Sequence, residues 1–137
     1  MKHGMLKRAL PRSAPIAIAI ALGLAFAACA DRDDKEASPR IVIRGADVQH
    51  GKQLVTLYNC GACHAIAGVP HASGRVGPPL NGFAGRVFIA GELPNEPNSL
   101  MRWLMNPSGV EPGTIMPDMG ISAAEARDMA GYLYTLR

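Results

Sequence analysis

The sequence predicts an all-α fold in which three principal helices are joined by long loops. Apolar residues recur with helical spacing in three separate segments, and no segment alternates apolar and polar residues over any length. The intervening segments are rich in glycine and proline, which interrupt regular structure and favour turns. The 137 residues suffice for one domain, and there is no internal repeat.

The first predicted helix begins at Asp47, whose side chain can cap it. Its apolar face has i, i+3, i+4 spacing and consists of Leu54, Leu57 and Tyr58. The helix ends just before the sequence NCGACH, and a loop over residues 65–96 follows.

The second predicted helix lies in NSLMRWLMNP, where Asn98 or Ser99 can cap it and Pro107 ends it. Its apolar face consists of Leu100, Trp103 and Leu104. The third predicted helix occupies SAAEARDMAGYLYTLR, in which Ser122 and Glu125 have the spacing of a capping box. Its apolar stripe consists of Met129, Leu133 and Leu136, flanked by Tyr132.

The net charge of +3 originates in the N-terminal segment. Four Lys/Arg and no acidic residue precede an uncharged run over residues 13–30, a pattern typical of an export signal. From Cys29 onward, ten Lys/Arg stand against eleven Asp/Glu. This near-neutral balance gives no reason to expect nucleic-acid binding.

The end of the uncharged run predicts lipid attachment at Cys29, because FAAC resembles a bacterial lipobox. We expect a lipoprotein-type signal peptide over residues 1–28, a tether over 29–45 and the folded domain over 46–137. The domain would be exported and anchored by lipid on the periplasmic side of a bacterial membrane. Cleavage at an ordinary signal site and an uncleaved N-terminal anchor are the alternatives.

Cys60, Cys63 and His64 form a C-x-x-C-H motif, the attachment signature of c-type haem. The two thiols are spaced to form thioether bonds with the two vinyl groups, and the histidine then lies under the iron. A structural zinc site needs four ligands, and only His50 and His71 remain in the domain. A thiol–disulfide motif would follow a strand in a βαβ pattern, which is absent.

The composition also favours a large apolar cofactor. The chain has only seven aromatic residues, and a domain of this size with long loops buries little surface of its own. A cofactor at the centre would give the helices and loops something to pack against.

The iron needs a sixth ligand, for which the candidates are Met116, Met119, His71, His50 or no protein group. Met116 is favoured because it lies on a loop between two prolines, in EPGTIMPD, rather than on a helix. Met119 is three residues further on, and the spacing does not exclude it.

Four segments in order resemble the class I cytochromes c: CGACH, VGPPLNGFAGR, LMRWLMNPSGVEPGTIMP and the aromatic-bearing C-terminal helix. The resemblance covers residues 46–137 and implies the fold of that family, wrapped around one covalent haem c. It matches Cys60 and Cys63 to the thioether positions and His64 and Met116 to the two iron ligands.

The resemblance also implies roles for residues around the haem. Pro78 matches the proline whose carbonyl accepts the histidine Nδ1–H. Arg86 and Thr114 match residues near the haem propionates. Trp103 stands where many members place a tyrosine near the ligand sulfur, so either packing or N–H donation is expected there.

A narrower segment resembles the cytochrome c domain fused to subunit II of some haem-copper oxidases, although no copper-site cysteine/histidine cluster is present. The resemblance implies a one-electron carrier, not an enzyme, in a membrane respiratory chain. Its partners would be redox proteins, a haem-copper oxidase among them, and the membrane itself through the lipid anchor. No nucleic acid and no small-molecule substrate is expected. A haem-bearing structural subunit of a respiratory complex and a ligand-binding haem sensor remain alternatives.

Overall fold

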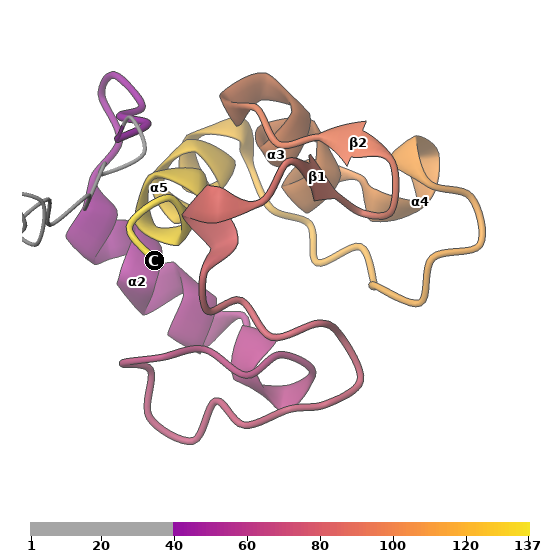
Figure 1. Cartoon of the computed structure of the whole chain (residues 1–137), viewed down its shortest axis with the longest axis horizontal. Helices are drawn as coiled ribbons and strands as arrows, with labels where there is room; N and C mark the ends of the chain where they lie inside the picture. The colour runs from indigo at the N-terminus through magenta and orange to yellow at the C-terminus, as the bar shows by residue number, and fades with distance from the viewer. Residues whose placement is uncertain (1–39) are drawn as a thin grey trace, which may run out of the picture. The chain divides into compact units, whose positions relative to one another are not determined.

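The computed structural model describes residues 40–137 (Figure 1). The predicted signal peptide and the predicted lipid site at Cys29 lie outside the described residues. Ile41 and Ile43 are half-buried against the core, so the last part of the predicted tether contacts the domain. Across residues 40–137, no helix is both long enough and apolar enough to cross a membrane.

Three main helices confirm the predicted all-α class: α2 (Val48–Leu57), α3 (Pro97–Met105) and α5 (Ala123–Leu133). The C-terminal helix α5 packs against both α2 and α3 (Figure 1). Leu54 from α2, Leu100 from α3 and Met129 from α5 are all buried in one core.

The ends of two helices are capped as predicted. The Asp47 side chain accepts hydrogen bonds from the first turn of α2, and Ser122 and Glu125 form the capping box of α5. The predicted cap of α3 is wrong, because the helix begins two residues earlier. Glu96 is its N-cap without a side-chain hydrogen bond, and Pro97 takes the first helical position, where a missing N–H needs no partner.

The predicted apolar face of α2 is partly wrong. Leu57 is 77% exposed, whereas Val55 is 1% exposed and Gly51 is buried. The face that packs on α5 therefore has the i, i+3, i+4 spacing at Gly51, Leu54 and Val55. A glycine in the stripe carries no apolar signal, which is why the sequence pattern favoured the next register.

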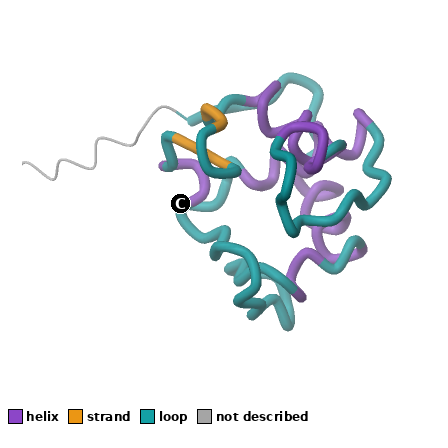
Figure 2. The backbone as a smooth tube through the Cα atoms, turned by 90° about the vertical axis from the view of Figure 1, so that its right-hand side faces the viewer, coloured by secondary structure: helices purple, strands orange, loops and turns teal. Residues whose placement is uncertain are grey.

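The predicted loops contain several short elements. A 3-10 turn, η1 (Cys60–Ala62), holds the first motif cysteine, and another, η2 (Phe83–Gly85), precedes a hairpin. The hairpin pairs β1 (Phe88–Ile89) antiparallel with β2 (Leu93–Pro94), and a single-turn helix, α4 (Pro107–Val110), follows α3. These elements are too short to give a periodic sequence signal, and long loops still connect the helices (Figure 2).

Helices α2 and α5 approach closely at Gly51. A Cβ built there would lie 2.0 Å from the carbonyl oxygen of Asp128 on α5. The Asp128 carboxylate then joins the helices, accepting from the backbone N–H of Asp47 at 3.0 Å and from His50 Nδ1 at 2.9 Å. The hydrogen bond from His50, followed by that from Asp47, holds the pKa of Asp128 below its ordinary value.

We expect Gly51→Ala to lower the free energy of unfolding by about 1–3 kcal/mol, because the added Cβ overlaps the Asp128 carbonyl and forces the helices apart. The higher helix propensity of alanine, worth about 1 kcal/mol, works in the opposite direction. Denaturant unfolding of the haem-loaded chain measures the difference.

Gly85→Ala is the matched control, because a Cβ there meets nothing within 4 Å. We expect its stability to lie within about 0.5 kcal/mol of the original chain. A Gly51→Ala chain as stable as this control would contradict the close approach.

Candidate haem site

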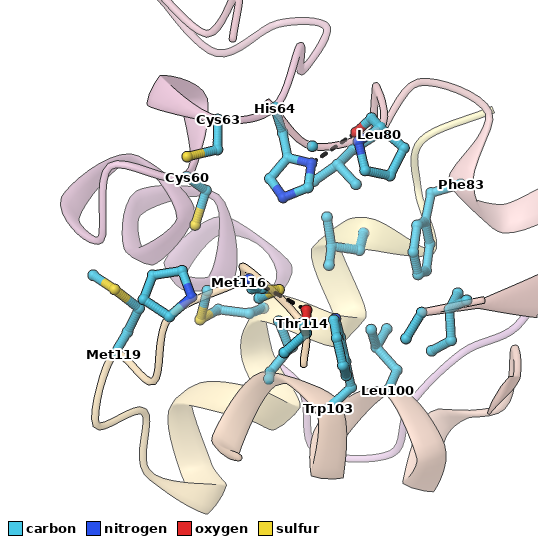
Figure 3. Close-up of a pocket in the computed structure, with 18 of the residues that line it drawn as sticks. Cys60, Cys63, His64, Leu80, Phe83, Leu100, Trp103, Thr114, Met116 and Met119 are labelled. Atoms are coloured by element: carbon cyan, nitrogen blue, oxygen red, sulfur yellow. Dashed lines mark hydrogen bonds between the residues drawn. The ribbon is translucent and has the colours of Figure 1, made fainter. Parts of the chain in front are cut away.

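The C-x-x-C-H motif forms a tight turn directly after α2. Asn59 takes a left-handed conformation with φ of 54°, which redirects the chain into η1. The carbonyl of Cys60 then accepts from the backbone N–H groups of Cys63 (3.2 Å) and His64 (2.9 Å). This local folding brings all three motif side chains to one cavity (Figure 3).

The imidazole of His64 is held by the loop that follows it. Its Nδ1 lies 2.7 Å from the carbonyl oxygen of Pro78, where the sequence resemblance predicted a contact. Because a carbonyl can only accept, Nδ1 carries a proton in this contact, so the neutral form of the ring has its free lone pair on Nε2. Gly77 packs flush against the ring, since a Cβ there would lie 2.3 Å from His64 Cε1.

The two motif cysteines are unpaired thiols and half-buried. Burial is the main cause that raises the pKa of the Cys60 thiol. No group of three or more His, Cys, Asp and Glu within residues 40–137 is arranged to hold a metal ion. The described part of the chain therefore contains no set of ligands for the structural zinc site considered above.

The loop after α4 supplies the facing side of the cavity. Thr114 shapes it, because its Oγ1 accepts from the backbone N–H of Met116 at 3.2 Å. Met116 is half-buried and packs against the core, whereas Met119 is 41% exposed, although both line the cavity. His50 and His71, the other candidates for an iron ligand, are not among the lining residues.

The cavity has a volume of about 490 Å³ and is lined mainly by apolar side chains. All eight residues predicted to contact a haem lie on its wall: Cys60, Cys63, His64, Pro78, Arg86, Trp103, Thr114 and Met116. In Figure 3 the motif side chains lie on one side, and Thr114, Met116 and Trp103 lie on the facing side. Segments more than 50 residues apart in sequence therefore converge on one space.

Arg86 is the one arginine or lysine among the residues that line the cavity. Its guanidinium lies 5.6 Å from the centroid of the Phe83 ring, and Nη2 donates to the carbonyl of Pro79. The half-buried guanidinium beside an aromatic face puts a positive charge at the cavity, where an acidic group of a ligand would be attracted.

Several wall residues were not predicted. Tyr58 lines the cavity and donates from its hydroxyl to Glu125 Oε1 at 3.0 Å, a contact across 67 positions that no local pattern reveals. Ala90 and Gly91, at the tip of the hairpin, also line it with φ of 49° and 89°. The pair Ala-Gly between two short apolar runs was a weak turn signal for this hairpin.

The family model for cytochrome c matches residues 48–137. The chain belongs to the cytochrome c family. This match spans all three main helices and both sides of the cavity, so the family fold and the observed helical fold agree. Members of the family are typically electron carriers rather than enzymes, and this cytochrome c is accordingly an electron carrier.

A curated relative is the cytochrome c oxidase subunit 2 of Alkalihalophilus pseudofirmus. The two sequences are 33% identical over 90 residues, which cover 64% of this chain and 25% of the relative. This cytochrome c therefore spans about a quarter of the length of that protein.

The family implies a covalent haem c, and the cavity fits this group. Two free thiols stand beside an imidazole whose Nδ1 donates to the Pro78 carbonyl, and a thioether faces them across an apolar space. Gly77 lies so close to the His64 ring that any side chain at this position would overlap the imidazole. These donors are the ones that hold and ligate haem in c-type cytochromes.

We expect Gly77→Ala to displace the His64 ring, because the added Cβ would overlap Cε1 and Nδ1. The hydrogen bond from His64 to Pro78 would weaken. The purified protein would then contain less haem, and a smaller share of that haem would have a low-spin spectrum. Visible absorption of purified protein, normalised to polypeptide, measures the loss. Gly85→Ala again serves as control, and a Gly77→Ala chain with full haem content and an unchanged spectrum would refute the close packing.

Proposed function

We propose that this cytochrome c carries one electron on a single haem c whose iron is held by His64 and Met116, within a membrane respiratory chain. The observation that carries the proposal is the pairing of these side chains on facing sides of one cavity (Figure 3). A histidine held through Nδ1 on one side and a half-buried thioether on the other would supply the two protein donors to the iron.

When bound, haem c supplies a reversible one-electron change between Fe(III) and Fe(II). The residues around the cavity hold the two proposed iron ligands in place. The hydrogen bond to Pro78 orients the His64 ring, and the turn at Thr114 fixes the backbone of Met116. If His64 and Met116 both bind the iron, no open position is left on it, and electron transfer would be favoured over binding of a small ligand.

The rim of the cavity suits contact with a partner protein. Three apolar side chains that line the cavity are well exposed: Val76 (65%), Ile115 (77%) and Met119 (41%). Residues 40–137 contain eight Lys/Arg and seven Asp/Glu, so strong electrostatic steering is not expected. Short-range apolar contact around the opening would then guide docking.

We propose a terminal haem-copper oxidase as the electron acceptor. The similarity to a protein named cytochrome c oxidase subunit 2 supports this choice. A lipid on Cys29, on the periplasmic side of the membrane, would keep the carrier beside such a partner. Confinement raises the effective concentration without tight binding.

We expect Met116→Ala to abolish the weak absorption band at long wavelength that arises from iron–sulfur ligation, and to lower the reduction potential. Loss of the thioether donor from Fe(II) is the physical reason. Met119→Ala is the matched control, because Met119 lies on the same loop but is more exposed. Spectroscopic redox titration of both purified variants measures the two effects.

The opposite pattern, with the band lost only in Met119→Ala, would move the ligand to Met119. An unchanged spectrum in both variants, together with ready binding of carbon monoxide by the ferrous form, would instead favour a sensor with an open iron position.

We expect the reduced, haem-loaded protein to be oxidised by respiratory membranes of its source organism, and an oxidase inhibitor to block the reaction. Cys29→Ala should leave the potential unchanged but slow the oxidation by at least about tenfold at equal concentration, because the carrier is no longer confined. Stopped-flow absorption measures both rates. Binding to membranes without electron exchange would indicate a structural subunit and contradict the carrier proposal.

A further inference from the structure

A hydrogen-bond network behind the cavity wall fixes the backbone around Arg86. Asn95 follows β2 and is not among the residues that line the cavity. Its Nδ2 donates to the carbonyls of Phe83 and Arg86, both at 3.0 Å, and its backbone N–H donates to the carbonyl of Val87 at 2.9 Å. One side chain thereby clamps both ends of the turn that carries Arg86.

Tyr134 fixes the orientation of the Asn95 amide. Its hydroxyl donates to Asn95 Oδ1 at 3.0 Å, so the amide oxygen faces Tyr134 and the NH₂ group must face the two carbonyls. Tyr134 is only 1% exposed, and burial, with a smaller contribution from Glu96, raises the pKa of Tyr134 to about 12. The hydroxyl therefore remains a donor throughout the physiological pH range.

The same residues support the Arg86 side chain. The Arg86 guanidinium rests against the Phe83 ring, and Phe83 is 4% exposed. The Phe83 ring packs edge-on against Tyr134, with 5.8 Å between centroids and 62° between planes. Asn95 and Tyr134 thus hold the backbone of Arg86 and also the aromatic surface on which its charge lies.

We propose that Asn95 is a positioning residue that raises the reduction potential of the bound haem by holding the Arg86 guanidinium at the cavity wall. The inference rests on the proposed electron-carrier function. A fixed positive charge favours the reduced state, because Fe(II) has one positive charge fewer than Fe(III). The effect falls with distance and with exposure to solvent, so a released guanidinium contributes less.

The test is a redox titration of the haem-loaded chain carrying Asn95→Ala. We expect the equilibrium constant for reduction to fall about three- to tenfold, where tenfold corresponds to about 59 mV for a one-electron couple. Asn81→Ala is the matched control: Asn81 Oδ1 accepts from the backbone N–H of Ala67 at 2.6 Å and makes a comparable loop contact elsewhere. Its potential should stay unchanged.

A double-mutant cycle separates positioning from general loosening of the fold. Arg86→Gln alone should lower the potential, and adding Asn95→Ala to Arg86→Gln should lower it no further. An equal fall from Asn95→Ala in both backgrounds, or no fall in either, would overturn the inference.

Tyr134→Phe decides the question if Asn95→Ala fails to retain haem. This variant keeps the ring against Phe83 and removes only the hydroxyl that orients the Asn95 amide. We expect a smaller fall in potential that disappears in the Arg86→Gln background, and an unchanged potential would overturn the inference. If the haem-loaded chain shows no reversible Fe(III)/Fe(II) couple, the carrier function is overturned as well. If the couple is reversible but its potential does not change in these variants, only this inference is overturned.

Discussion

The packing of α5 on α2 is the contact on which the site depends. The haem-attachment turn follows the last residue of α2, and the loop that bears Met116 ends where α5 begins. The close approach at Gly51 sets the distance between these helices and so between the two sides of the cavity. The hydrogen bond from Tyr58 to Glu125 then joins the end of α2 to the start of α5.

The loops have a defined shape because side chains bond to their backbone. The carbonyl of Pro78 accepts from His64, the amide of Asn81 accepts from the 65–96 loop itself, and Asn95 closes the turn after η2. In the described part of the chain, every buried side-chain nitrogen and oxygen has a hydrogen-bond partner. Such bonds replace the regular backbone ladders that glycine- and proline-rich segments cannot form.

The sequence predicted helices well wherever caps and periodicity agreed, as at Asp47 and Ser122. It failed where the packing face contained a residue without an apolar signal. Only a glycine fits at position 51, because α5 approaches the backbone of α2 there. The sequence pattern does not reveal this contact, so the exposed Leu57 was wrongly assigned to the core. The hairpin and α4 were missed because two to four residues are too few to show a period.

The sequence by itself determined the attachment motif, because C-x-x-C-H is a local spacing that needs no partner to be recognised. Composition also predicted a fold built around something larger than its own side chains. Tertiary structure alone decided how the 65–96 loop folds, that Met116 is more buried than Met119, and which residues support the backbone of Arg86. Those features arise from contacts between segments far apart in sequence, where periodicity and spacing carry no information about which side chains meet.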